Sequence, residues 1–490
     1  MKFPIVAGEK PQVQEMRRAE VAIIATPSMG NLIPAVEFAT HLINHHPSHI
    51  SVVILAISMP QRPILDDYIQ SRIANKQIRF IQLHHVDSPP PDQYSSGIEF
   101  ISGYIENHKP IIKQTLNHLQ TTVSDSEPVP LVGLFIDMFC TSMIDVANDL
   151  NIPCYLFFSS PAASLGFMLH LTTLPATESF VTELAVPSYA NAIPSNIFPS
   201  FCIKKEEFGY STFVRHTLRY KETRGIIVNT FQELEPYALD SFSSNYMDLP
   251  PIYPVGPIID HVGPAKWHSN RSGHEKTIEW LDRQPESSVV FLCFGSMGTL
   301  TPVQVREIAK GLERAGYRFL WALREPAKAK LKLPNDYENL DESLFPDGFI
   351  DRTAEIGLVC GWVPQVSVLA HKSIGGFVSH CGWNSILESI SYGVPIATWP
   401  LYGEQQLNAF EMVRELGLGV EIRLDSRDKG GDLVLAEDVE RGVRELMDGG
   451  DGELRKKVKE MSEKSNKALM ENGSSFKALG DLIDVLLSNI

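Results

Sequence analysis

Short apolar runs alternate with segments of helical periodicity through the first half of the chain. Continuous apolar runs of this length are typical of strands buried on both faces of a sheet. Strands and helices that alternate in this way predict a parallel, doubly wound sheet. The predicted strands are Val21–Ala25, Val52–Ile57, Ile78–Leu83, Leu131–Ile136, Cys154–Phe158 and Gly225–Val228, and the predicted helices include Ile33–Ile43, Ile98–Leu119 and Ser142–Leu150.

Closely spaced prolines then interrupt the pattern between Pro250 and Pro264, which predicts a linker. The alternation resumes with Val289–Phe294, Val303–Ala315 (helical), Arg318–Leu323, Gly357–Cys360, Gly375–Ser379, Ile396–Trp399 and Gly419–Ile422. We therefore expect an α/β protein of two Rossmann-like domains. The predicted boundaries are a loose tail at 1–19, a first domain at 20–250, a linker at 251–275, a second domain at 276–473 and a terminal helix at 474–490.

Composition narrows the classes of partner. The chain has 43 Lys and Arg against 59 Asp and Glu, and its net charge of −16 argues against nucleic acid or an anionic membrane as a partner. Its six cysteines are scattered, without the spacing of a disulfide framework or a CxxC site, which is typical of reduced thiols. No apolar run has the length of a membrane span or a signal peptide. We expect a cytoplasmic protein without stable membrane insertion.

The most informative segment runs from Trp362 to Gln405. Within it, the apolar run Gly375–Ser379 predicts a strand, and Asn384–Ser391 predicts a helix, so that residues 380–383 form the turn between them. The start of a helix carries unpaired N–H groups and the positive end of the helix dipole, which together make a phosphate site. Glu388 follows one helical turn later and is suited to accept hydrogen bonds from ribose hydroxyls, while Trp362 offers a flat face for a base.

This segment resembles, nearly residue for residue, the signature box of plant family-1 UDP-sugar-dependent glycosyltransferases, from W-x-P-Q through H-C-G-W-N-S to the closing E-Q. The resemblance implies that Trp362, Val363 and Gln365 hold the uracil and that Glu388 holds the ribose. It also implies that Ser296, His380, Gly382, Asn384 and Ser385 bind the diphosphate. Trp383, Glu404 and Gln405 would bind the sugar hydroxyls, and a terminal Gln in this box accompanies UDP-glucose. The family often has Asp at the position of Glu404.

From about residue 20 onward the chain resembles the two-domain fold called GT-B, in which the second domain binds the donor and the first binds the acceptor. The resemblance implies inverting transfer of glucose from UDP-glucose to a small lipophilic acceptor, such as a phenol, giving a β-glucoside. The helix start would stabilise the leaving UDP, and no Asp-x-Asp metal motif occurs in the chain. We therefore expect no metal and no cofactor other than the co-substrate, and we expect a monomer.

The chain departs from the family after its first strand. Family members have a catalytic His in a Gly-His-x-x-Pro pattern, oriented by an Asp, whereas this chain reads Gly30, Asn31 and then Pro34, with Asp137 at the position of the Asp. An amide has no basic lone pair near neutral pH, so Asn31 can position an acceptor but cannot take its proton. A missing general base typically costs about 10²–10⁴-fold in rate.

Four explanations remain open for the missing base. Asp137, without its His, acts directly or through a water; His84 or His85, after the third strand, substitutes for it; the acceptor arrives already ionised; or the protein is a weak or inactive catalyst that binds UDP-sugar.

The acceptor pocket is expected from residues at or just after strand ends: Met29, Met138, Phe139, Phe158 and Ser159, with Phe167 and Met168 beyond them. A dinucleotide-dependent oxidoreductase is a rival interpretation of two Rossmann-like domains. It is disfavoured because the FGSMG sequence after Phe291 lacks the G-x-G-x-x-G order.

Overall fold

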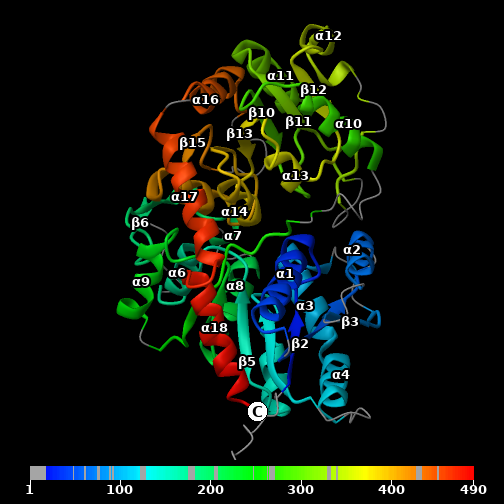
Figure 1. Cartoon of the computed structure of the whole chain (residues 1–490), viewed down its shortest axis with the longest axis vertical. Helices are drawn as coiled ribbons and strands as arrows, with labels where there is room; N and C mark the ends of the chain where they lie inside the picture. Colours follow the sequence, from blue (N-terminus) through cyan, green and yellow to red (C-terminus); the bar gives the residue numbers. More distant parts are fainter. Residues whose placement is uncertain are drawn as a thin grey trace, which may run out of the picture.

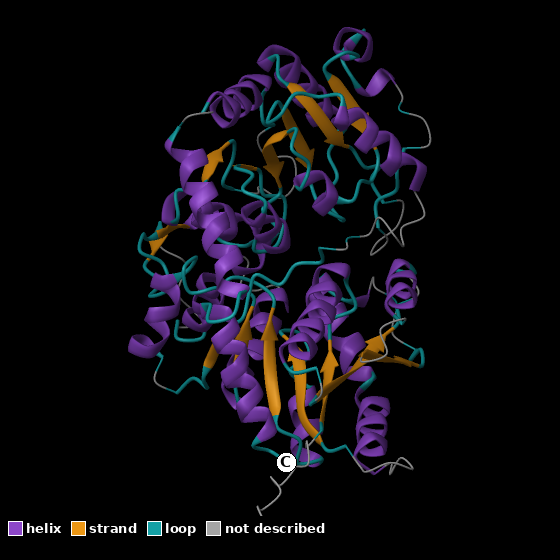
Figure 2. Cartoon of the chain, viewed as in Figure 1, coloured by secondary structure: helices purple, strands orange, loops and turns teal. Residues whose placement is uncertain are grey.

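The computed structural model describes most of the chain: residues 18–47, 49–59, 62–73, 78–87, 90, 93–121, 129–174, 182–203, 208–246, 248–261, 263, 271–327, 333–337, 340, 342–425, 433–449 and 452–490. Two parallel sheets lie one above the other, each covered by helices on both faces (Figures 1 and 2). The predicted tail therefore falls almost wholly outside the described residues, apart from Arg18 and from Ala19, which begins the first strand.

The first sheet has seven strands in the order β3-β2-β1-β4-β5-β8-β9. Its inner strands are buried on both faces, and apolar runs such as LVGLFID in β4 supply the residues for both, whereas the edge strand Ile78–Leu83 is partly exposed. The strands are β1 (Ala19–Ile24), β2 (Ile50–Ile57), β3 (Ile78–Leu83), β4 (Leu131–Asp137), β5 (Cys154–Phe158), β8 (Ile226–Val228) and β9 (Ile252–Pro254); β6 (Glu183–Leu184) and β7 (Ile193–Pro194) form a separate antiparallel pair.

The helices of this half are α1 (Met29–His45), α2 (Ile64–Arg72), α3 (Gly97–Asn107), α4 (Lys109–Thr121), α5 (Met143–Asp149), α6 (Ala162–Leu171), α7 (Ser200–Ile203), α8 (Phe208–Arg219) and α9 (Pro236–Asn245). The single helix predicted over Ile98–Leu119 is wrong, because the structure divides it into α3 and α4 at His108. Pro110 is the reason: it has no N–H to donate to the preceding turn and is tolerated only at the start of a new helix.

The second sheet has six strands in the order β12-β11-β10-β13-β14-β15. The strands are β10 (Val289–Cys293), β11 (Arg318–Ala322), β12 (Gly357–Cys360), β13 (Ile374–Ser379), β14 (Ile396–Thr398) and β15 (Gly419–Glu421). The helices are α10 (Arg271–Asp282), α11 (Pro302–Ala315), α12 (Phe349–Thr353), α13 (Gln365–Leu369), α14 (Trp383–Ser391), α15 (Gln405–Phe410), α16 (Ala436–Asp448), α17 (Glu453–Leu469) and α18 (Ser474–Leu487).

The strand order determines where a ligand can bind. In both sheets the order reverses beside the first strand, between β1 and β4 and between β10 and β13. Loops leave the carboxyl ends of these paired strands in opposite directions, which opens a crevice at each reversal point. The first crevice lies at Asn31 and Asp137, and the second at Ser296 and His380.

The segment predicted as a linker, 251–275, is partly structured. β9 pairs with β8 and so belongs to the first sheet, while residues 262 and 264–270 lie outside the described part. After α17 the chain crosses back, and α18 packs against α1, β4 and β9 of the first half (Figure 1). Ser475 Oγ donates to the carbonyl of Gly256 at 2.5 Å, and Asn489 Nδ2 to that of Val132 at 3.2 Å, so the C-terminal segment ties the two halves together.

The fold is the predicted α/β architecture of two Rossmann-like domains. No helix in the described part of the chain is both long and apolar enough to span a bilayer.

Candidate active site

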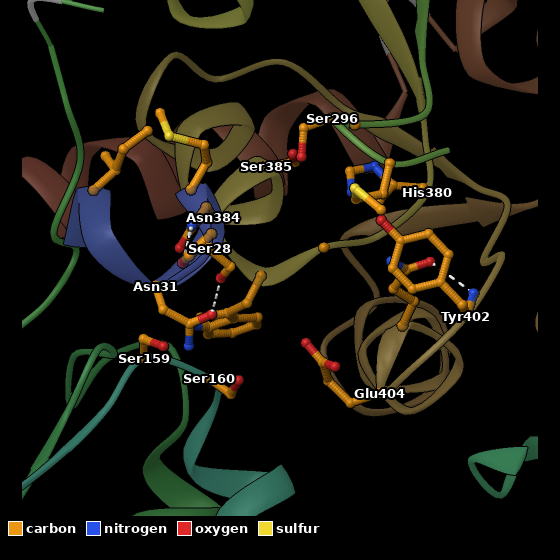
Figure 3. Close-up of a pocket in the computed structure, with 18 of the residues that line it drawn as sticks. Ser28, Asn31, Ser159, Ser160, Ser296, His380, Asn384, Ser385, Tyr402 and Glu404 are labelled. Atoms are coloured by element: carbon orange, nitrogen blue, oxygen red, sulfur yellow. Dashed lines mark hydrogen bonds between the residues drawn. The ribbon is translucent and has the colours of Figure 1, made fainter. Parts of the chain in front are cut away.

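One cavity of about 480 Å³ lies between the two sheets and is lined by both crevices. Figure 3 shows Ser28, Asn31, Ser159 and Ser160 of the first half facing Ser296, His380, Tyr402 and Glu404 of the second. All predicted donor-binding residues line it: Ser296, Trp362, Val363, Gln365, His380, Gly382, Trp383, Asn384, Ser385, Glu388, Glu404 and Gln405. So do Asn31 and the predicted acceptor residues Met29, Met138, Phe139, Phe158 and Ser159, together with Phe167 and Met168.

The turn from β13 into α14 is the part of the cavity predicted to bind the diphosphate. The helix begins at Trp383, one residue before its predicted start, with Gly382 as its N-cap. Cys381 takes a left-handed conformation (φ +62°), held by hydrogen bonds from its N–H to Ser379 Oγ (3.1 Å) and from Asn408 Nδ2 to its carbonyl (3.0 Å). A non-glycine residue persists there only where its surroundings impose it. The turn directs the free N–H groups of the helix start into the cavity.

His380 is packed between two glycines. A Cβ atom at Gly295 would lie 2.4 Å from His380 Nε2, and one at Gly382 would lie 2.6 Å from it, so the imidazole fits only beside glycine. Burial lowers the pKa of His380 to about 4, which keeps the ring neutral at pH 7. A hydrogen bond with the backbone of Cys293 partly offsets the effect of burial on this pKa. The neutral side chain therefore adds no charge to the cavity.

The part of the cavity predicted to bind the nucleoside contains Gln365 and Glu388. Gln365 Nε2 donates to Ser385 Oγ and to Glu388 Oε2, both at 2.7 Å. Burial raises the pKa of Glu388 to about 7. The backbone N–H of Trp362 donates to Asp336 Oδ1 at 2.7 Å, and this carboxylate also pairs with Arg324 at 3.1 Å. The ion pair with Arg324 fixes the Asp336 carboxylate, and the hydrogen bond to this carboxylate fixes the backbone of Trp362.

Two residues of the predicted donor set have partners across the interface between the halves. Trp383 Nε1 donates to the carbonyl of Asn229 at 2.7 Å, and Asn384 Nδ2 donates to the carbonyl of Gly30 at 3.0 Å. These side-chain atoms are therefore engaged within the protein, and the roles of the two residues toward the donor stay a prediction. The two partners lie 154 and 354 positions from Trp383 and Asn384 along the chain, so local sequence does not reveal them.

The end of the cavity predicted to face the sugar carries Glu404 and Gln405. Gln405 Oε1 accepts from the backbone N–H groups of Leu401 (2.9 Å) and Tyr402 (3.0 Å), and the Gln405 side chain also hydrogen-bonds to the Tyr402 phenol, so its amide is held in place. Glu404 points into the cavity in Figure 3, and burial raises the pKa of its carboxyl group. Side chains fixed in this way suit the orientation of a pyranose ring.

Asn31 is engaged at both ends of its side chain. Its Nδ2 donates to Asp137 Oδ2 at 2.8 Å, and its Oδ1 accepts from the hydroxyl of Ser28. Asp137 also accepts from Thr26 Oγ1 at 2.5 Å and from the backbone N–H of Phe139 at 3.2 Å. Asp137 therefore keeps a hydrogen-bond partner although the family His is replaced, because the amide of Asn31 donates to it.

Asp137 is 1% exposed and does not line the cavity. Burial raises the pKa of its carboxyl group above the usual value. The hydrogen bonds from Thr26, Phe139 and Asn31 lower this pKa but do not offset the effect of burial. Its contacts Asn31 and Thr26 both line the cavity and so lie between Asp137 and a bound substrate. This placement favours a role for Asp137 in positioning the side chain of Asn31, and it disfavours direct proton abstraction by the Asp137 carboxylate.

His84 and His85 do not line the cavity. They follow β3, the outermost strand of the first sheet, whereas the crevice lies at β1 and β4. His85 contacts Tyr104 Oη at 3.3 Å, and its side chain is 51% exposed. The suggestion that either histidine replaces the missing base has no support in this placement.

Several cavity residues carry no local sequence signal. Arg62 lies between two prolines in the β2–α2 loop, and Tyr402 lies between β14 and α15. Only the folded chain brings them to the same cavity as Asn31. The apolar part of the acceptor half is completed by Ile33, Ile64, Leu65, Ile101, Pro199, Phe213 and Leu407.

Two facing Rossmann-like sheets with a nucleotide-sugar site between them define a glycosyltransferase of the GT-B class. The comparisons with known proteins agree. Residues 215–449 match the family model described as UDP-glucoronosyl and UDP-glucosyl transferase. The chain is 54% identical over 476 residues to UDP-glycosyltransferase 43 of Pueraria montana var. lobata (96% of this chain, 100% of the relative). It is 47% identical to anthocyanidin 3-O-glucosyltransferase 1 of Manihot esculenta (93% of this chain, 99% of the relative).

Among solved structures, Medicago truncatula UGT71G1 complexed with UDP-glucose superposes with a TM-score of 0.86 at 42% identity, covering 96% of this chain and 98% of that one. The chain belongs to the plant family-1 UDP-sugar-dependent glycosyltransferases and is an enzyme of that family.

Proposed function

We propose that the protein transfers glucose from UDP-glucose to a small phenolic acceptor with inversion, giving a β-glucoside. The observation that carries the proposal is the single cavity in which a polar nucleotide-sugar site meets an apolar pocket at Asn31. Relatives whose names specify glucosylation of a flavonol or an anthocyanidin support a flat phenolic acceptor, and the Medicago structure complexed with UDP-glucose supports the donor.

Each half supplies part of the reaction. The start of α14, with the neutral His380, stabilises negative charge that develops on the departing UDP. Glu404 and Gln405 hold the sugar so that its anomeric carbon faces the acceptor pocket. Attack from the face opposite the departing UDP converts an α-linked donor into a β-linked product.

A second candidate is a weak or inactive catalyst that binds UDP-sugar. It is favoured by one observation, which is that Asn31 uses its amide toward Asp137 and its carbonyl toward Ser28 and offers no base. Binding of UDP-glucose occurs under both candidates, so only product formation distinguishes them. Chromatography of reactions with UDP-glucose and a panel of phenols tests the proposal: a β-glucoside supports transfer, and donor binding without any product supports the second candidate.

We further propose that transfer needs no metal or other cofactor. In the described part of the chain, no group of three or more His, Cys, Asp or Glu side chains is arranged to hold a metal ion. A chelator should therefore leave the rate of glucoside formation unchanged. A monomer in the cytoplasm remains our expectation, to be checked by light scattering and by cell fractionation.

A further inference from the structure

Arg62 is a buried cation without a counter-charge. It is 9% exposed and lines the cavity. Its Nη1 donates to the carbonyl of Pro27 at 3.0 Å, and its Nε has no partner. In the described part of the chain, no carboxylate lies within 4.0 Å of its guanidinium, although most buried arginines are paired. Removing a charge from water without pairing it costs free energy, so this arrangement is most stable when an anion occupies the cavity.

The other charged groups of the cavity do not fill this role. Asp260 pairs with Arg72 at 2.7 Å and Arg324 with Asp336 at 3.1 Å, while Glu388 accepts from Gln365. The remaining ionisable side chains that line the cavity are Cys293, His380, Tyr402 and Glu404, and of these Tyr402 is the one that acts on the pKa of Arg62. The phenol of Tyr402 is close enough to Arg62 for the guanidinium to lower the pKa of the phenol. Burial has the larger effect and raises this pKa to about 12. Tyr402 therefore stays neutral and does not balance Arg62.

The position of Arg62 links it to the acceptor. Its contact with Pro27 holds the guanidinium beside the start of α1, where Ser28 is the N-cap and Asn31 lies in the first turn, and Ile64 and Leu65 of α2 line the apolar half. Its influence on Tyr402 places it near the end predicted to face the sugar as well. The diphosphate has its own site at the start of α14, which belongs to the other half of the molecule.

We propose that Arg62 binds the ionised oxygen of a phenolic acceptor, so that the acceptor is used as its phenolate and Asn31 has no proton to remove. A guanidinium binds an oxyanion with charge-assisted hydrogen bonds and so favours the ionised form. The phenol releases its proton to the solvent, the phenolate lone pair forms the bond to the anomeric carbon, and UDP departs with the electrons of the bond that breaks. This inference rests on the proposed transfer to a phenol and names the residue that replaces the base.

A binding experiment tests Arg62 independently of turnover. 4-Nitrophenol is titrated with pH in the presence of excess protein and UDP, and the visible absorbance of the nitrophenolate reports the ionised fraction of the bound phenol. In the wild type we expect the acid dissociation constant to rise about tenfold or more relative to the free phenol. Arg62→Met should abolish the increase, and Arg62→Lys should retain part of it.

Arg79→Met serves as the matched control, since Arg79 lies in the same half, has a 53% exposed side chain and does not line the cavity. It should behave as the wild type, and thermal unfolding should show all variants folded. Two results would overturn the inference: no nitrophenol binding to the wild type, or the same nitrophenol ionisation in Arg62→Met as in the wild type. If the second result came with a tenfold loss of UDP affinity, Arg62 would be a phosphate contact. If the wild type makes no glucoside from any phenol, the proposed function fails, while the nitrophenol titration still decides the role of Arg62.

Discussion

Replacing Asn31 by His should increase the rate for weakly acidic phenols and hardly change it for acidic ones. In the native protein Asn31 Nδ2 donates to Asp137 Oδ2 at 2.8 Å. A histidine at this position can donate one ring N–H to the same carboxylate, which leaves its other nitrogen toward the cavity as a general base. Asp137 would then orient the imidazole and stabilise its charged form, in the manner of an Asp–His pair.

The size of the gain follows from acceptor ionisation. A phenol with a pKa of about 10 is ionised to only about 1 part in 300 at pH 7.5, so a base that removes the proton during attack can raise the rate by roughly that factor. This estimate lies within the usual contribution of general base catalysis, about 10²–10⁴-fold or roughly 2.7–5.5 kcal/mol. A phenol with a pKa near 7 is mostly ionised already, and its gain should stay below about twofold.

The assay measures kcat/KM for the acceptor at saturating UDP-glucose across phenols of graded pKa. Asn31→Ala is the control, since it removes the amide without adding a base and should show no gain. Adding Asp137→Asn to the Asn31→His variant should remove most of the increase, because the new imidazole loses its partner. An equal gain on all phenols would refute the reasoning, since it would show that the histidine improves binding rather than proton transfer.

Three further predictions concern the donor site and the interface between the halves. Trp362→Ala should weaken UDP binding by about 1–3 kcal/mol in isothermal titration, because a base would lose its stacking surface; unchanged affinity would place the uracil elsewhere. The pKa of about 7 for Glu388 predicts that UDP affinity rises as the pH increases through 7, since hydroxyl donors favour the ionised carboxylate, whereas Glu388→Gln should show a flat pH profile. Burial, together with neighbouring Glu235, raises the pKa of Glu411 well above 4.5, so its contribution to stability falls as the pH rises above 4.5. Urea unfolding should thus show Glu411→Gln gaining stability relative to the wild type from pH 5 to pH 8, and a constant difference would contradict the assignment.

Much of the architecture was accessible from pattern alone. The alternation of short apolar runs and helical segments predicted two parallel sheets, because strands buried on both faces must be apolar throughout. Most of the residues predicted to bind the donor lie in one continuous segment, where a strand, a turn and a helix start position them locally, so their common location was accessible too; their roles stay a prediction. The division between α3 and α4 was missed, although Pro110 was a signal for it.

The order of strands within each sheet was beyond such patterns. Periodicity shows that a strand exists but not which strands are its neighbours. Pattern alone therefore does not distinguish the distance of His84 and His85 from the acceptor from that of residues that follow β1. The structure places β3 at the edge of the sheet and thereby removes both histidines from the cavity.

By itself, the sequence determined the two-domain α/β fold and the presence of Asn31 where the family has a catalytic histidine, because each of these is written in local pattern or in residue identity; the roles of the nucleotide-sugar residues stay a prediction. Only the tertiary structure decided that Asn31 donates to Asp137, 106 positions away, and that Arg62 enters the cavity without a carboxylate partner in the described part of the chain. The physical reason is that a hydrogen bond or an unpaired charge depends on which distant groups come within a few ångströms, and packing alone determines those distances.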